Sequence, residues 1–272
     1  MPDHFSRAND ISGRVPVVLA IAGFDPSGGA GLIADIKTLG ALGCTPVAAI
    51  TSLTFQNSSG VRGAIHQTAE SLRSQLLPLI EAFEIDAIKI GMLPTREIVE
   101  EVVRLILEKK LSAPVIDPVM HSSSGFELMN AEAVAALLTE LMPLAELITP
   151  NIPEAEALTG TTIADENAMR LAAGKLREMG ARAALVKGGH LKEQRSGRRS
   201  EFRQALDILD NKGAVTVFRS DWIDGPPARG TGCMLSSAIA AGLARRLKLE
   251  DAIRAARSFV ARAISDPPEI ET

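Results

Sequence analysis

Short apolar runs alternate with longer helical stretches along almost the whole chain, and this alternation limits the folds that it can adopt. The first run, residues 15–22, is apolar almost throughout and rich in valine, which is typical of a strand buried on both faces of a parallel sheet. Such an order predicts βαβ units and a central, mostly parallel sheet with helices on both sides. Further strands are predicted at residues 47–53, 87–90, 115–119, 147–149, 183–186 and 215–218.

The helical stretches between these strands have the length and periodicity of helices that cover a sheet. No repeat or linker divides the chain, so we expect a disordered lead at residues 1–14 and one domain over residues 15–272. The Arg- and Ser-rich segment 192–203 is expected to be a mobile surface loop. The predicted helices cover residues 31–42, 69–83, 96–109, 131–141, 166–179, 232–246 and 249–264.

Composition excludes several classes of protein. With 29 Lys and Arg against 33 Asp and Glu, the net charge of −4 argues against a nucleic-acid binder that depends on a broad basic surface. No apolar run approaches the roughly 18 residues that a membrane span needs, and the first 14 residues lack the apolar core of a signal peptide. Two cysteines cannot form a disulfide framework. We therefore expect a cytoplasmic protein that binds neither nucleic acid nor membrane.

A glycine-rich turn follows the first predicted strand. Gly28, Gly29 and Gly31 would let the backbone approach a ligand closely. The turn lacks the lysine of a P-loop and does not match GxGxxG, so a tight strand-to-helix turn without a ligand is an equally simple interpretation.

A second glycine segment, Gly230-Thr231-Gly232-Cys233, leads directly into an apolar helix. Backbone N–H groups at a helix start lack partners within the helix, and with the helix dipole they form an anion site. A cysteine in that first turn is expected to have a lowered pKa and thiolate character. The alternative is a buried structural cysteine, which is how we interpret Cys44.

Three further polar residues follow predicted strands, at the sheet edge where ligands bind in parallel α/β proteins. Asn151 and Glu154 are placed to hold Mg²⁺, which needs few protein ligands when phosphate oxygens contribute; a helix cap explains the pair equally well. Lys187 precedes two glycines and is placed to contact a terminal phosphate; the alternative is a lysine at the sheet edge that extends its ammonium into solvent. The four histidines show no metal-ligand spacing, so we assign no zinc site.

Taken together, these segments identify a family. Over residues 17–263 the chain closely resembles the hydroxymethylpyrimidine and phosphomethylpyrimidine kinases of thiamine biosynthesis, within the ribokinase-like superfamily. The resemblance implies a three-layer αβα sandwich, a homodimer, and the use of ATP and Mg²⁺. It is carried, in order, by Gly23-x-Asp25-Pro26-Ser27-Gly28-Gly29-Ala30-Gly31-x3-Asp35-x-Lys37-Thr38, Gln56-Asn57, Lys89-x-Gly91-Met92, Asp117-Pro118-Val119-Met120, Thr149-Pro150-Asn151-x-Pro153-Glu154, Lys187-Gly188-Gly189-His190 and Gly230-Thr231-Gly232-Cys233.

The resemblance also implies roles for particular residues. Cys233 takes the position of the catalytic aspartate of ribokinase-type sugar kinases, with Gly230, Thr231 and Gly232 completing an anion hole. Asn151 and Glu154 match the magnesium and phosphate motif of the family, in which Glu154 would bind the metal. Lys187 and Thr231 match positions that bind the ATP phosphates. The residues implied to line the pyrimidine pocket are Gly23, Asp35, Gln56, Met92 and Val119.

The implied reaction is ATP-dependent phosphorylation of 4-amino-5-hydroxymethyl-2-methylpyrimidine and of its monophosphate to the diphosphate. Phe24 stands where a small residue is expected, and Arg229 where a histidine commonly precedes the Gly-Thr-Gly-Cys run. A pyridoxal or pyridoxine kinase is the nearest alternative. A catalytically silent pyrimidine-binding protein is another, and the presence of Lys187, Glu154 and Cys233 argues against it. Cys233 is a base or a member of the anion hole; the sequence leaves both roles open.

Overall fold

The computed structural model describes residues 14–57, 59–122, 124–189, 204–223 and 229–265. Its centre is a nine-stranded sheet in the order β3-β2-β1-β4-β5-β6-β7-β8-β9. The six central strands, β2-β1-β4-β5-β6-β7, pair in parallel. Strand β3 at one edge and strands β8 and β9 at the other pair antiparallel to their neighbours. The strands are β1 Val17–Phe24, β2 Thr45–Asn57, β3 Gly60–His66, β4 Ala87–Ile90, β5 Val115–Ile116, β6 Leu147–Ile148, β7 Ala183–Lys187, β8 Gln204–Asn211 and β9 Ala214–Asp221.

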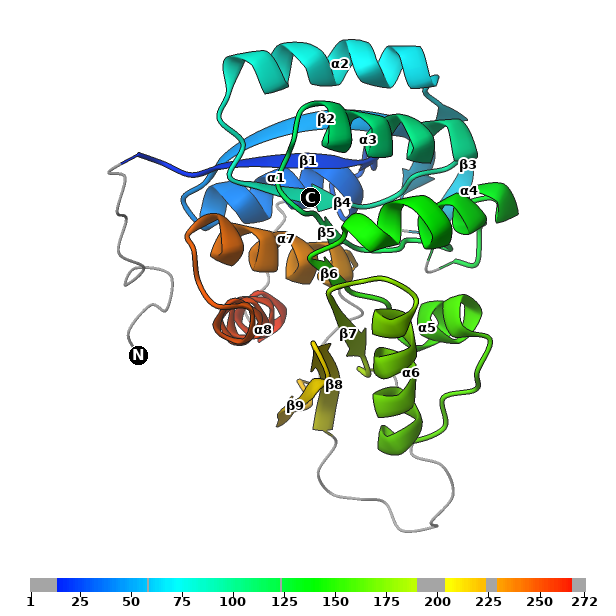
Figure 1. The fold of residues 1–272 in the computed structure, drawn as a ribbon, viewed down its shortest axis with the longest axis vertical. Coiled ribbons are helices and arrows are strands. Elements are labelled where there is room, and N and C mark those ends of the chain that lie inside the picture. The colour runs from blue at the N-terminus through cyan, green and yellow to red at the C-terminus, as the bar shows by residue number, and fades with distance from the viewer. Residues whose placement is uncertain (1–13, 58, 123, 190–203, 224–228, 266–272) are drawn as a thin grey trace.

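Helices cover both faces of this sheet, which confirms the predicted three-layer αβα arrangement (Figure 1). Successive side chains of a strand point to opposite faces, and β1 shows the consequence. Its Leu19 packs in the core beneath α2 to α6, whereas Ala20 packs in the core beneath α1, α7 and α8. The helices are α1 Gly31–Ala41, α2 Ala69–Ala82, α3 Arg96–Glu108, α4 Ala131–Ala136, α5 Ile152–Thr159, α6 Glu166–Glu178, α7 Thr231–Ala244 and α8 Leu249–Ser265.

Several predicted boundaries were wrong. The predicted helix 131–141 ends as α-helix at Ala136 and continues as one π-helical turn, Leu137–Leu141. For helix α5 only a cap at Asn151 and Glu154 was considered, and the helix itself was not predicted. Strands β3 and β8 were not predicted either. β3 and β8 pair antiparallel to their neighbours, and β3 is partly exposed along its length, so neither gives the unbroken apolar run of a doubly buried strand.

The two segments that were expected to be mobile are described in part or not at all. Residues 1–13 and the Arg-rich segment 192–203 lie outside the described residues. Arg14, the last residue of the expected lead, is anchored, because its guanidinium donates to both oxygens of Asp86 at 2.9 and 2.7 Å. Within the part of the chain that the structure describes, no helix is both long enough and apolar enough to cross a lipid bilayer.

Candidate active site

A cavity of about 960 Å³ opens at the edge of the sheet where the parallel strands end, as expected for an open α/β sheet. One part, which we call the β1 end, is lined by residues that follow β1, β4 and β5 and by the C-terminal half of β2. The other part, the α8 end, lies between β8, β9 and helix α8. The start of helix α7 lines the cavity between these two parts.

Four of the residues predicted for a ring pocket line the β1 end: Gly23, Gln56, Met92 and Val119. Gly23 leaves room for Met92 there, because a Cβ atom at position 23 would lie 2.7 Å from the Met92 sulfur and would displace that side chain. Phe24, the last residue of β1, also lines this end. The large side chain of Phe24, which stands where a small residue was expected, therefore forms part of the pocket wall.

Asp35 was also predicted to line the ring pocket, and the structure places it elsewhere. Its side chain is fully buried in the protein. One oxygen accepts from both Lys89 Nζ and Ser237 Oγ at 2.8 Å, and the other accepts from Lys89 Nζ at 2.8 Å. With both oxygens engaged and no exposed surface, Asp35 cannot contact a ring bound in the cavity of this structure.

The loop before α7 brings the second glycine segment against the first. Gly230 has a φ angle of +72°, and a Cβ atom there would lie 2.3 Å from the carbonyl oxygen of Gly29. Only glycine satisfies both the left-handed conformation and this close approach. Helix α7 then begins at Thr231 with no side-chain cap, so the N–H groups of its first turn are available to an anion in the cavity.

Cys233 lies in this first turn, lines the cavity and is only half-buried. Burial nevertheless raises the pKa of the thiol to about 11, although the nearby charge of Lys89 opposes the rise. Asp35 and Asp117 raise it further. The expectation of a lowered pKa was therefore wrong for the protein without ligands, because desolvation is the largest influence on the thiol at this site.

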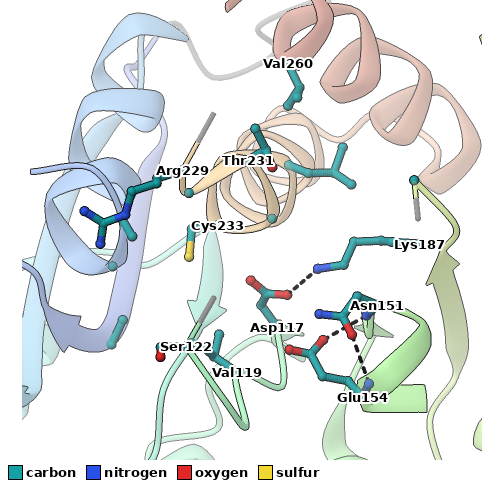
Figure 2. A pocket seen from close by; sticks show the side chains of 18 of the residues that line it. Asp117, Val119, Ser122, Asn151, Glu154, Lys187, Arg229, Thr231, Cys233 and Val260 are labelled. Atoms are coloured by element: carbon teal, nitrogen blue, oxygen red, sulfur yellow. Dashed lines mark hydrogen bonds and ion pairs between the residues drawn. The ribbon is translucent and has the colours of Figure 1, made fainter. Parts of the chain in front are cut away.

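Lys187 ends β7 and forms an ion pair with Asp117, which follows β5; the Nζ–Oδ1 distance is 2.7 Å (Figure 2). Thr149 donates to the same oxygen at 3.2 Å. Although burial alone would raise it, the pKa of Asp117 lies below its usual value because of the charges of Lys187 and Lys89. No role for Asp117 was predicted from the sequence, where it lies inside the predicted strand 115–119. The available signal was a carboxylate within an otherwise apolar strand.

Asn151 and Glu154 form a capping box at the start of α5: each side chain accepts from the other's backbone N–H, at 2.9 and 2.8 Å (Figure 2). The cap interpretation is therefore correct, and both residues also line the cavity. Burial raises the pKa of Glu154 to about 7, the charge of Lys187 lowers it, and Asp117 raises it. The carboxylates of Glu154 and Asp117 lie near each other, and a cation bound there would offset their negative charge.

The α8 end combines apolar and polar walls that the sequence analysis did not predict. Arg257 contacts Asp207 and donates to Ser220 Oγ at 3.0 Å, and Gly188 N donates to Asp207 at 3.1 Å. These polar groups come from β8, β9, α8 and the turn after β7, and the sequence does not show that these elements lie together. The apolar wall is formed by Trp222, Ile223, Val260, Ala261 and Ile264.

Arg229 joins the β1 end to the loop before α7. Its Nη1 donates to the carbonyl oxygen of Asn57 at 2.7 Å and to Ser27 Oγ at 3.3 Å, and its Nη2 lies 3.5 Å from Asp25 Oδ2. Burial alone would raise the pKa of Asp25, but hydrogen bonds from Ser27 and the charge of Arg229 hold it below its usual value. Arg229 thus connects three separate segments around the cavity.

Comparison with known proteins identifies this arrangement. A family model for phosphomethylpyrimidine kinase matches residues 25–272. The chain belongs to the phosphomethylpyrimidine kinase family. A hydroxymethylpyrimidine/phosphomethylpyrimidine kinase of Aquifex aeolicus is 39% identical over 254 residues, which cover 93% of this chain and 96% of that protein. The chain is thus a phosphotransferase of this family, as the sequence motifs predicted.

Two solved structures show the same fold. A phosphomethylpyrimidine kinase from Clostridium difficile is 34% identical with a TM-score of 0.78, over 92% of this chain and 100% of that one. An ADP complex of Bacillus subtilis pyridoxal kinase is also 34% identical, with a TM-score of 0.82 over 94% and 95%. Since both kinds of kinase share this fold at equal identity, the fold does not decide between a pyrimidine and pyridoxal as substrate.

Proposed function

We propose that the protein uses ATP and Mg²⁺ to phosphorylate 4-amino-5-hydroxymethyl-2-methylpyrimidine and then its monophosphate, as in thiamine diphosphate biosynthesis. The observation that carries this proposal is the position of Cys233 and of the uncapped start of α7 between the two ends of one cavity. The ring binds at the β1 end and the nucleotide at the α8 end, so that acceptor oxygen and γ-phosphate meet at α7.

Phosphoryl transfer depends mainly on positioning and on stabilising charge. In both transfers the acceptor oxygen attacks the γ-phosphorus and the bond to the β-phosphate oxygen breaks. In the first transfer the acceptor is the hydroxymethyl oxygen, which gives up its proton. In the second transfer the acceptor is a phosphate oxygen of the monophosphate, which is already ionised. The N–H groups at the start of α7 stabilise the transferring oxygens. Lys187, whose ammonium lies close to Gly232, adds a positive charge there. Cys233 lies beside the acceptor and receives its proton or hydrogen-bonds to it.

The residues around Glu154 fit a magnesium ion. Among the described residues, no group of three or more histidine, cysteine or acidic side chains forms a metal-binding cluster. Mg²⁺ characteristically keeps several waters and binds through one or two carboxylates together with substrate phosphates. Glu154, with one oxygen in the capping box and the charge of Asp117 nearby, would hold it; bound there, the ion would neutralise charge on the phosphates.

Replacing Glu154 by glutamine tests this assignment. Glutamine retains an oxygen for the capping box but lacks the charge, so we expect the Mg²⁺ concentration for half-maximal rate to rise about tenfold or more. The measurement is turnover over a Mg²⁺ series at saturating ATP and pyrimidine. Glu166→Gln is the matched control, because Glu166 pairs with Arg170 and Arg219 and does not line the cavity. An unchanged Mg²⁺ requirement in Glu154→Gln would remove Glu154 from the metal site.

Replacing Gln56 by alanine tests the ring end of the cavity. A polar ring edge that loses its amide partner costs about 1–3 kcal/mol, so the KM for the pyrimidine should rise roughly tenfold to hundredfold while the KM for ATP stays the same. Gln67→Ala, whose side chain accepts from Ser71 instead, should change neither constant. Equal rises in both KM values for Gln56→Ala would contradict the assignment.

The predicted homodimer stays a prediction. One face of the β2–β3 hairpin carries three side chains that are partly exposed in the isolated chain: Leu53, Phe55 and Ile65, with Leu53 and Ile65 paired across the strands. An exposed apolar face of this kind is consistent with a contact between two chains.

A further inference from the structure

The proposed mechanism leaves one buried ion pair without a role. Lys89, on β4, and Asp35, on α1, are both fully buried, and the Lys89 ammonium donates to both Asp35 oxygens at 2.8 Å. Ser237 on α7 donates to the same carboxylate at 2.8 Å. Because desolvation of a buried ion pair can cost more than the attraction returns, such a pair is a poor source of stability and calls for another explanation.

This pair lies one helical turn from Cys233. Ser237 follows Cys233 by four residues on α7, and Asp35 follows Gly31 by four residues on α1, so each helix presents its two residues on one face. The backbone of Gly31 faces the Cys233 thiol and lowers its pKa, and one turn further along Ser237 donates to Asp35. Two successive turns of α1 and α7 therefore hold the thiol and the ion pair next to each other.

Gly91 provides the space for the Lys89 ammonium. A Cβ atom at position 91 would lie 2.9 Å from Lys89 Nζ and 3.1 Å from the Cβ of Ala22. A larger residue would displace the ammonium from this position. Lys89 and Gly91 both lie along the wall of the β1 end, which explains why a lysine and a glycine stand two residues apart at the end of β4.

Four charged groups face Cys233 from the elements packed around it: Lys89 on β4, Asp35 on α1, Asp117 after β5 and Lys187 on β7. Burial raises the pKa of the thiol most, Lys89 lowers it, and Asp35 and Asp117 raise it. Lys89 and Asp35 therefore act on the thiol with opposite signs although they are bonded to each other.

We propose that Lys89 and Asp35 are positioning residues for phosphoryl transfer. Lys89 supplies the positive charge that Cys233 faces from the sheet, and Asp35, oriented by Ser237, fixes that ammonium and offsets part of its charge. Burial is the main reason that Cys233 stays a thiol in the protein without ligands, and Asp35 adds to this effect while Lys89 opposes it. The effect of the pair on turnover rests on the proposed role of Cys233, but its effect on the thiol itself does not.

The test is the rate at which iodoacetamide alkylates Cys233 at pH 8.5. It uses a Cys44→Ser background, in which Cys233 is the remaining cysteine of the chain. Asp35→Asn should make alkylation about tenfold faster, because Lys89 then acts unopposed and the thiolate fraction rises. The double variant Asp35→Asn, Lys89→Met removes both charges without leaving one unpaired, and should make alkylation about tenfold slower. Asp86→Asn, in the separate ion pair with Arg14, is the control and should leave the rate unchanged.

Opposite changes in the two variants support the proposal, because damage to the fold alone would change both rates in one direction. Changes of the same sign, or below about twofold, would overturn it. If Asp35→Asn does not fold, the double variant decides: slower alkylation supports the proposal, and an unchanged or faster rate contradicts it. Its kcat should also fall about tenfold with both KM values retained. If the alkylation rates shift as expected but Cys233→Ser keeps full kcat, the catalytic role of Cys233 fails while the coupling stands.

Discussion

Replacing Cys233 by serine should lower kcat by about a hundredfold or more, while the KM values for ATP and the pyrimidine change by less than about threefold. A serine hydroxyl has nearly the same shape and keeps a hydrogen bond to the acceptor. Its pKa lies far above that of even a buried thiol, so its anion is much less available to take the acceptor's proton. Steady-state kinetics with saturating Mg²⁺ measure this directly. The expected split between kcat and KM separates a catalytic role from a role in binding.

The control for this experiment is Cys44→Ser. Cys44 is buried outside the cavity, just before β2, and burial raises the pKa of its thiol as well. Its replacement should therefore leave both kcat and KM nearly unchanged. If Cys233→Ser keeps full kcat, the thiol is neither base nor essential anion-hole member, and the backbone N–H groups of α7 together with Lys187 must account for the catalysis.

The second large effect is expected for Lys187→Met. The ammonium of Lys187 adds a positive charge next to the start of α7, and loss of a charged group at the transferring phosphoryl group typically costs about a hundredfold to a thousandfold in rate. We expect kcat/KM for ATP to fall by about that factor, with a smaller change in pyrimidine binding measured in the absence of nucleotide. Lys109→Met, on the exposed end of α3, is the matched surface control.

Loss of the Lys187 charge also changes Asp117. Lys187 is the largest influence that lowers the pKa of this buried carboxyl, so the pKa of Asp117 should rise in Lys187→Met. The variant Lys187→Met, Asp117→Asn leaves no carboxylate without its partner. If the double variant recovers the rate, the defect of the single variant comes from the unpaired Asp117, and a role of Lys187 at the phosphates is contradicted.

The strand pattern predicted most of the fold because doubly buried strands leave an unbroken apolar signal. The strand Ala87–Ile90 was predicted to the residue, and the parallel order follows from the helices between the strands. The antiparallel strand Gly60–His66 was not predicted, because its residues are partly or wholly exposed. Helix Ile152–Thr159 has only eight residues, too few for a helical periodicity to stand out.

From the sequence, the strand pattern could predict only those site residues that follow a parallel strand. Residues that follow β1, β5, β6 and β7 converge on one cavity, as the topology of a parallel sheet requires. Whether the Asp35 side chain points into the cavity or toward Lys89 and Ser237 depends on how α1 packs against α7. The burial of Cys233 likewise depends on the elements around it. Neither packing contact is visible in one sequence, so the ring-pocket position of Asp35 and the lowered pKa of Cys233 were both wrong.

The most direct test of the proposed function is a comparison of three acceptors in one assay. Release of ADP from ATP and Mg²⁺ would be measured with 4-amino-5-hydroxymethyl-2-methylpyrimidine, with its monophosphate and with pyridoxal. We expect turnover of both pyrimidines, and kcat/KM for pyridoxal lower by about a hundredfold or more, which is about 2.7 kcal/mol of discrimination in the transition state. A kcat/KM for pyridoxal equal to or above those of the pyrimidines would contradict the assignment of the β1 end as a pyrimidine site.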